Sequence, residues 1–277
     1  MNLKDEYNKN FVSLIAKQLA KHHKSFNQKK FVMEVIDENW ERKELKERMR
    51  HTTNKIAEHL NLPYDGQLKV LKLIAPNYNG LQGMLFPDFV QVYGKDDYKT
   101  SIKALELFTQ YSTAEFAIRP FIEKYPDKTL NQLFKWSNHK NEHLRRLASE
   151  GTRPKLPWAS PLKDFIKDPS PCIPILENLK ADESLYVKKS VANHLNDISK
   201  NHPELVLQIC NKWHGKNIHT NWIVKHALRT LLKQGNKKAL SIFGLNDAQN
   251  IDIKDLKLSD NTIKIGEYIY FEFDIIN

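Results

Sequence analysis

The chain has 277 residues, of which 40% are hydrophobic and 27% are charged, a composition that excludes a disordered protein and fits one or two globular domains. Its formal net charge of +10 favours a polyanionic partner, with nucleic acid ahead of an acidic membrane surface. The N-terminus lacks the apolar stretch of a signal peptide, and no run reaches the roughly 18 apolar residues of a membrane span. We expect a cytoplasmic protein that stays with the nucleoid.

The two cysteines, Cys172 and Cys210, are too few for a disulfide framework in a chain of this length, so we expect both to be buried thiols in a reducing compartment. They suggest no redox chemistry.

From Leu3 to about Leu245, apolar residues recur every three or four positions between breaks rich in Pro, Gly or Asn. This pattern predicts many short amphipathic helices. The stretches 98–138, 139–178 and 182–213 each predict a helix pair with one apolar face, which is typical of a helical-repeat solenoid because one pair cannot bury that face alone. We therefore expect an all-α domain over residues 1–245.

The pattern changes in residues 246–277. This segment has three Lys and seven Asp or Glu, a local charge of −4, which leaves +14 on residues 1–245. Apolar residues nearly alternate from Ile251 to Leu258 and from Ile263 to Ile275, with Asp260-Asn261 between them, and this predicts two strands. Because two strands do not make a stable domain, either the chain stops inside a β-sandwich or the strands lean on the helical body.

Three acidic residues stand out within the helical part. Glu115 follows Ser112 by three residues, the spacing of a capping box, so a helix cap is the simpler interpretation. Glu150 precedes Gly151, which is placed as the residue after a helix, and Asp197 lies in the last turn of another predicted helix. A helix C-terminus disfavours a carboxylate by roughly 0.3 to 1 kcal/mol, so stability does not explain these two acids. The alternative for Asp197 is a solvated or salt-bridged surface acid.

Side chains near these acids suit a nucleic acid. Tyr186, Ser190, Asn193 and Asp197 form a polar stripe beside a core-facing one on the same predicted helix. Cations around Glu150 and the aromatic Trp158 after it could hold phosphates and cover a base or sugar. The alternative is a basic loop with Trp158 packed against the next helix. Of two further tryptophans, Trp213 and Trp222, we expect at least one in the core.

Several common sites are not indicated. His139 and His143 have the i and i+4 spacing of metal ligands, but no third ligand follows at a recognisable spacing. The sequence also has no Gly-rich phosphate loop and no nucleophile elbow. We expect neither a metal nor an organic cofactor.

Five strings resemble the alkylpurine DNA glycosylases of the AlkC and AlkD superfamily, and the AlkC branch most closely. They are Thr113–Pro120, Glu142–Pro154, Leu156–Trp158, Tyr186–Ile198 and Trp222–Gly235. The likeness covers nearly all of residues 3–245 and is densest from 113 to 235. It implies a right-handed solenoid of HEAT-like repeats whose concave basic face holds duplex DNA.

The resemblance also implies an activity. It is that of a monofunctional glycosylase of base excision repair, which removes cationic bases such as 3-methyladenine and, in the AlkC branch, 3-methylcytosine or 1-methyladenine, without a metal or cofactor. Some AlkC relatives have an immunoglobulin-like domain after the solenoid, which implies that residues 246–277 are the start of such a domain, incomplete here. We take a monomer as the default.

The resemblance assigns roles to individual residues. Glu115, Glu150 and Asp197 match the acids of the active site, and Trp158 matches the aromatic beside the lesion, so the cap and the surface acid become the lesser interpretations. For contacts with DNA we expect the neighbouring cations and one further tryptophan: Arg145, Arg146, Arg153, Lys155, Lys188, Lys189, Trp222, Lys225 and Arg229.

Two other functions are open to a basic helical repeat. One is a non-catalytic module that binds DNA structure or a protein partner, since many solenoids only bind. The other is an RNA-binding repeat protein, which would need a base-reading pair at fixed places in each repeat. We find no such pair.

Overall fold

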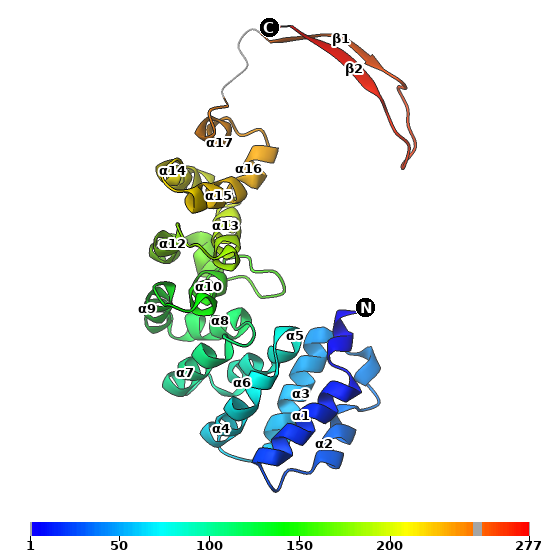
Figure 1. Ribbon diagram of the computed structural model, residues 1–277, viewed down its shortest axis with the longest axis vertical. Helices are drawn as coiled ribbons and strands as arrows, with labels where there is room; N and C mark the ends of the chain where they lie inside the picture. The colour runs from blue at the N-terminus through cyan, green and yellow to red at the C-terminus, as the bar shows by residue number, and fades with distance from the viewer. Residues whose placement is uncertain (1, 246–250, 277) are drawn as a thin grey trace. The chain divides into compact units, whose positions relative to one another are not determined.

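A computed structural model describes residues 2–245 and 251–276. The described chain divides into two compact units, one up to Thr230 and the other from Leu231 onward (Figure 1). The expected domain boundary after residue 245 lies within the second unit, next to residues 246–250, which are outside the described residues.

The first unit consists of short helices. Its first half contains η1 (Leu3–Glu6), α1 (Lys9–His22), α2 (Gln28–Val35), η2 (Trp40–Arg42), α3 (Leu45–Leu60), α4 (Tyr64–Ile74), η3 (Ala75–Asn77), α5 (Gly80–Gly83), α6 (Leu85–Tyr93) and α7 (Tyr98–Phe108). Its second half contains α8 (Glu115–Lys124), α9 (Pro126–Ser137), α10 (Glu142–Gly151), α11 (Lys163–Lys167), η4 (Ser170–Cys172), α12 (Ile173–Leu179), α13 (Leu185–Ser199), α14 (Pro203–Trp213) and α15 (Ile218–Ala227). Helix α16 (Arg229–Lys233) spans the boundary, and α17 (Lys237–Ile242) belongs to the second unit.

These helices stack as a repeat with two layers. Helices α3, α6, α8, α10, α13 and α15 contact one another in that order and form one layer. A second layer, visible on the other side of the stack in Figure 1, includes α7, α9, α12 and α14, each of which packs on members of the first layer. The expectation of an all-α helical-repeat fold is confirmed.

Several of the Asn and Pro residues at the breaks in the sequence pattern lie at the starts of helices. The side chains of Asn8, Asn27, Asn141 and Asn217 accept hydrogen bonds from the first backbone N–H groups of α1, α2, α10 and α15. Such caps satisfy donors that have no partner within the helix. Pro126 and Pro203 begin α9 and α14, where their missing N–H costs nothing.

The repeats are less regular than the sequence predicts. The stretch 98–138 holds three helices, α7, α8 and α9, rather than a pair, because Pro126 starts a new helix directly after Tyr125. The stretch 139–178 likewise holds the short α11 and η4 between α10 and α12. Only 182–213 is the simple pair α13 and α14.

Gly151 is the last residue of α10 and not the residue after it, since the C-cap is Thr152. Its φ is not among the positive ones, so no left-handed backbone requires a glycine here. The requirement is space: a Cβ atom at this position would lie 2.5 Å from Cγ2 of Ile118 in α8. Gly151 therefore allows α10 to approach α8 closely.

The strands β1 (Asp252–Leu258) and β2 (Phe271–Ile276) pair antiparallel in the second unit. The second strand begins later than the predicted Ile263. The carbonyl of Lys264 accepts a hydrogen bond from the N–H of Glu267, and Gly266 has a φ of 96°, so a turn replaces the expected strand there. Described residues of both strands are exposed on both faces except Phe273, which is half-buried.

We expect Gly151→Ala to lower the free energy of unfolding by about 1 to 3 kcal/mol, because the new methyl group overpacks against Ile118. Urea denaturation measures the change. Gly66→Ala in α4 is the matched control: its Cβ would meet Leu62 at 3.4 Å, an ordinary contact, so it should raise stability by about 0.5 kcal/mol. Equal effects at the two positions would contradict the packing role of Gly151.

Candidate active site

Glu115 is the first residue of α8, and its side chain does not cap the helix. Ala114 is the N-cap, and the hydroxyl of Ser112 donates to the carbonyl of Gly80 at 2.7 Å. The capping-box interpretation is therefore wrong, because the hydroxyl that it needs donates to the first residue of α5 instead. The Glu115 carboxylate is buried instead, near the positive end of the α8 dipole.

Arg146 of α10 holds the Glu115 carboxylate. Its Nη1 donates to Oε2 of Glu115 at 2.8 Å and to Oγ1 of Thr113 at 2.6 Å, and its Nη2 lies 3.3 Å from Oε1 of Glu115. Nη2 is also 3.6 Å from Oε1 of Glu150. The guanidinium packs over the ring of Tyr186, 4.9 Å from its centroid. Arg146 thus connects two of the three acids.

Glu150 lies in the last turn of α10, and both of its carboxylate oxygens are engaged. Oε1 accepts from Nη1 of Arg153 at 2.6 Å, and Oε2 accepts from the buried hydroxyl of Ser190 in α13 at 2.6 Å. A carboxylate held from both the loop after α10 and helix α13 has one defined orientation.

Asp197 lies in the last turn of α13, and only 3% of it is exposed. The interpretation of Asp197 as a solvated surface acid is therefore wrong, whereas the salt-bridged alternative holds. Its Oδ2 accepts a hydrogen bond from Nε of Arg153 at 2.8 Å and forms an ion pair with Nη2 of the same guanidinium at 2.8 Å. Its Oδ1 is 3.2 Å from Nζ of Lys200, whose side chain is 42% exposed. Arg153 thus stands between Asp197 and Glu150.

These contacts form one chain of ion pairs, Glu115, Arg146, Glu150, Arg153, Asp197 and Lys200, which we call the acid chain. Burial alone lowers the pKa of both arginines, but the adjacent carboxylates outweigh it and raise the pKa of each above its ordinary value. Both arginines therefore stay charged. Within the acid chain, three buried carboxylates face the buried guanidinium of Arg153, the half-buried guanidinium of Arg146 and the half-exposed ammonium of Lys200.

The predicted polar stripe on α13 lines this cluster. The ring of Tyr186 packs on Arg146, Ser190 donates to Glu150, and Asn193 accepts from Nη2 of Arg229 at 3.0 Å. The stripe ends at Asp197. Helical spacing of polar residues beside a core-facing stripe was the sequence signal for this wall of the site.

The loop between α10 and α11 presents Trp158, which is 59% exposed and has a φ of 64°. The alternative in which Trp158 packs against the next helix is therefore wrong. A positive φ is uncommon for a bulky residue and is held only where the surroundings fix it. Nζ of Lys46 in α3 donates to the carbonyl of Trp158 at 2.7 Å and provides one such restraint.

Buried Arg119 of α8 secures the same loop. It donates to the carbonyls of Gly151, Arg153 and Ser160 at 3.2, 2.8 and 2.7 Å. Burial lowers the pKa of Arg119 to about 10, so that it remains a cation at neutral pH. A hollow of about 210 Å³ lies beneath the loop and is lined by Lys46, Phe116, Arg119 and Trp158, among others.

The cations expected on DNA differ in exposure and in partners. Lys189 and Lys225 are exposed, and Lys155 and Arg229 are half-buried. Arg146 and Arg153 belong to the acid chain. Arg145 donates to both carboxylate oxygens of Asp182 at 2.6 and 3.1 Å and to two backbone carbonyls.

Lys188 and Trp222 form a separate contact. Buried Lys188 lies 3.0 Å from Nδ1 of His219 and over the ring of Trp222 at 5.8 Å. Trp222 is half-buried and stacks on His226. Trp213 is the expected core tryptophan, buried with its Nε1 donating to Glu177 at 2.9 Å.

Comparisons with known proteins show the family of the chain. A family model described as DNA alkylation repair enzyme matches residues 91–231. The Bacillus subtilis (strain 168) uncharacterized protein YhaZ is 49% identical over 274 residues, 99% of this chain and 77% of the relative. The chain belongs to the DNA alkylation repair enzyme family.

Two solved structures are also similar. One is the Pseudomonas fluorescens alkylpurine DNA glycosylase AlkC bound to DNA containing an abasic site analog, with a TM-score of 0.93 and 40% identity over 99% of this chain and 77% of that chain. The other is AlkD2 from Streptococcus mutans, with a TM-score of 0.46 and 23% identity over 77% of this chain and 97% of that chain. The expected likeness to the AlkC branch is confirmed.

For this member of the DNA alkylation repair enzyme family, sequence reasoning missed three side chains of the site. Lys200 follows Asp197 by three residues, a spacing that helical geometry makes a contact. Arg119 lies within a string that carried the resemblance, but its backbone partners are more than 30 residues away. Lys46 is 112 residues from Trp158, so no local signal could have found it.

The expected absence of metal chemistry rests on ligand spacing. Within residues 2–245 and 251–276, no group of three or more His, Cys, Asp or Glu side chains is arranged to hold a metal ion. His139 accepts from the N–H of Asn141 through Nδ1, and His143 packs edge-on against Tyr186. In the same described ranges, no helix has the length and apolar character to cross a membrane.

Both cysteines are buried, as expected. Burial raises the pKa of Cys172 well above its ordinary value and that of Cys210 to about 12, so both stay protonated. Neither thiol is suited to act as a nucleophile.

His194, one turn before Asp197 on α13, should make stability depend on pH. Its complete burial, aided by the charge of Arg153, lowers its pKa from 6.5 to about 3. Between these values the unfolded chain binds a proton that the folded chain does not. The free energy of unfolding should therefore fall as the pH drops below about 6.5, by up to about 1.4 kcal/mol per pH unit from this group.

His194→Leu removes this titration. Urea denaturation from pH 7 to pH 4.5 should show the stability of the variant improving relative to the wild type as the pH falls. Parallel pH curves for the two proteins would contradict a neutral, buried His194.

Proposed function

We propose that this chain is a DNA glycosylase that hydrolyses the N-glycosidic bond of cationic N-alkylated bases in DNA, for base excision repair. Family membership and 40% identity to AlkC over 99% of the chain support the reaction class. The single observation that carries the proposal is the acid chain, in which three buried carboxylates from three helices converge. The substrates would include 3-methyladenine and also 3-methylcytosine or 1-methyladenine.

The leaving group explains why carboxylates suffice. Alkylation of a ring nitrogen gives the base a positive charge, so the base departs as a neutral molecule and needs neither a strong general acid nor a Lewis acid. The proposal therefore assigns no metal and no organic cofactor. The species that needs stabilisation is the sugar, which develops oxocarbenium character as the glycosidic bond breaks.

The carboxylates would stabilise this cationic sugar. Fixed negative charge in a desolvated site acts on a developing positive charge without reorganising during the reaction. We assign this role to Asp197 and Glu150, one of which also orients or deprotonates the attacking water. Glu115 helps to position the sugar or the water.

Lys200 suggests how the site accepts a cation. It has the most exposed side chain of the acid chain, at 42%, and it pairs with Oδ1 of Asp197 at 3.2 Å. If the Lys200 ammonium moves into solvent, the acid chain is left with three carboxylates and only two guanidinium groups, a net negative charge. The cationic nucleoside would take the place of this ammonium.

Duplex DNA is the proposed partner of a monomeric protein acting at the nucleoid. Lys189 on α13 and Lys225 on α15 are exposed, and we assign them to phosphate contacts. Trp158 stands exposed on its loop, where its ring can cover the lesion or its sugar.

We expect Asp197→Asn and Glu150→Gln each to lower the rate of base release from methylated duplex DNA by roughly a hundredfold or more, because each removes a placed negative charge. Chromatography of the released free base measures it. The control is Glu183→Gln, an exposed acid just before α13, which should leave the rate unchanged. Release at the wild-type rate by Asp197→Asn would end the assignment.

The same assay tests the non-catalytic alternative. If the wild type binds DNA in a salt-sensitive manner but releases no base from any of the three lesions, the chain is a binding module.

We expect Lys189→Ala/Lys225→Ala to weaken DNA binding and to reduce the slope of log affinity against log salt by about two, one unit for each lost phosphate contact. Fluorescence anisotropy over a range of salt concentrations measures both. Lys99→Ala/Lys135→Ala changes two exposed lysines of the other layer, on α7 and α9, and should alter neither. Identical slopes in the two double variants would remove Lys189 and Lys225 from the DNA surface.

A further inference from the structure

Positive charge is concentrated in the first two helices, away from the acid chain. From Tyr7 to Met33 the sequence has six lysines and no Asp or Glu, so about a tenth of the chain carries +6 of the net charge of +10. Side chains of all six are exposed, and in the described part of the chain only Lys30 has an ion pair, with Glu34. None of these six lysines belongs to the acid chain.

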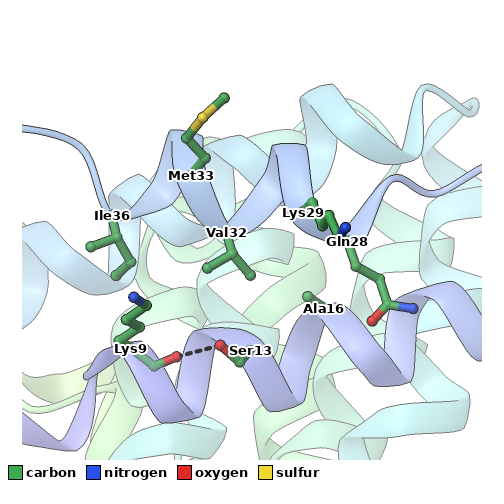
Figure 2. Close-up of a pocket in the computed structure, with 8 residues that line it drawn as sticks. All are labelled: Lys9, Ser13, Ala16, Gln28, Lys29, Val32, Met33 and Ile36. Atoms are coloured by element: carbon green, nitrogen blue, oxygen red, sulfur yellow. Dashed lines mark hydrogen bonds between the residues drawn. The ribbon is translucent and has the colours of Figure 1, made fainter.

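A groove of about 560 Å³ runs between α1 and α2 within this basic segment. Figure 2 shows Val32 of α2 and Ile36, its C-cap residue, pointing toward α1, with Ala16 on the facing side. Lys9 lies at the end of the view near Ile36, and Lys29 lies at the opposite end. The α1–α2 groove therefore has an aliphatic floor and an ammonium group toward each end.

The floor of the groove has few groups that could form hydrogen bonds with a polar ligand. Ala16 is a small residue, which leaves space between the helices, and the hydroxyl of Ser13 is already satisfied by the carbonyl of Lys9 at 2.8 Å. Met33 extends from α2 with 69% of its surface exposed. A flexible thioether beside aliphatic side chains is typical of surfaces that bind apolar groups.

We propose that the α1–α2 groove binds an acidic amphipathic peptide segment of a partner protein. Apolar side chains of the peptide would cover Val32, Met33 and Ile36, and its carboxylates would pair with Lys9 and Lys29. The amphipathic peptide matches both properties of the groove, as helix-in-groove complexes do.

Duplex DNA matches only one of these properties. Its phosphates would pair with the lysines, but the backbone has no apolar group to fill the floor, and phosphate oxygens against methyl groups would lose hydration without gaining hydrogen bonds. An uncharged apolar peptide would fill the floor and leave the lysines unpaired. Both the charge and the floor therefore favour the acidic peptide.

Four synthetic peptides of equal length test both properties. They combine acidic or basic polar positions with Leu or Ser at helical i, i+3, i+4 and i+7 spacing, and fluorescence anisotropy measures their binding to the full chain. We expect the acidic peptide with Leu to bind at least about tenfold more tightly than each of the other three.

Matched variants locate the site. Met33→Gln should weaken binding of this peptide by roughly fivefold or more, whereas Leu14→Gln, on α1 but outside the groove lining, should not. Lys9→Glu/Lys29→Glu should weaken it far more than Lys17→Glu/Lys21→Glu, which reverses two exposed charges of the same segment outside that lining. Circular dichroism and base release should stay at wild-type values, since none of these residues belongs to the acid chain.

Two outcomes would overturn the proposal. One is equal binding of the acidic peptides with Leu and with Ser, or equal losses in the groove variants and their controls, either of which would reduce the effect to bulk charge. The other is a loss of duplex DNA affinity in Lys9→Glu/Lys29→Glu without specific binding of the acidic Leu peptide, which would make the groove part of a DNA surface. Neither outcome depends on whether the chain is a glycosylase.

Discussion

Three carboxylates can share the interior of one protein only if cations accompany them. Removal of each charge from water costs several kcal/mol, which a single well-placed partner offsets only in part. Arg153 meets this constraint for two acids at once, because its planar guanidinium presents Nη1 to Glu150 and both Nε and Nη2 to Asp197. Lysine, with a single ammonium, could not bridge them in the same way.

The packing of α13 against the end of α10 brings these charged side chains into contact. Arg153 follows Glu150 by three residues, but Asp197 is 44 residues further along the chain, so the last turn of α13 must lie against the end of α10. Gly151 permits the approach of α10 to α8, and Ser190 joins α13 to Glu150. Because the C-terminal ends of α10 and α13 already carry partial negative charge, the guanidinium groups are all the more necessary.

Other parts of the molecule extend from this centre. The loop that carries Trp158 leaves directly from the Glu150 end of α10, and Arg119 fixes it through backbone carbonyls on both sides. Lys46 adds a restraint from α3, so the position of an exposed aromatic depends on helices far apart in sequence. In the proposed reaction, the carboxylates of the acid chain and the indole ring of Trp158 would act on the same nucleotide. The basic α1–α2 segment is built differently, from exposed lysines around an apolar floor, which suits a different ligand.

The sequence by itself determined the helical character, the breaks at Asn and Pro, and the polar stripe from Tyr186 to Asp197, because each depends on spacing along a single helix. The family resemblance selected the three acids, and the docking of α8, α10 and α13 brings them into one network of ion pairs. Tertiary structure decided which charges pair: Arg145 joins Asp182, whereas Arg146 and Arg153 join the acids. In the folded chain the Ser112 hydroxyl donates to the carbonyl of Gly80 and not to the predicted helix cap. A turn at Lys264 makes the second strand shorter than predicted. Periodicity reports which face of a helix is buried, but an ion pair between helices depends on how the helices dock, and no local pattern contains that information.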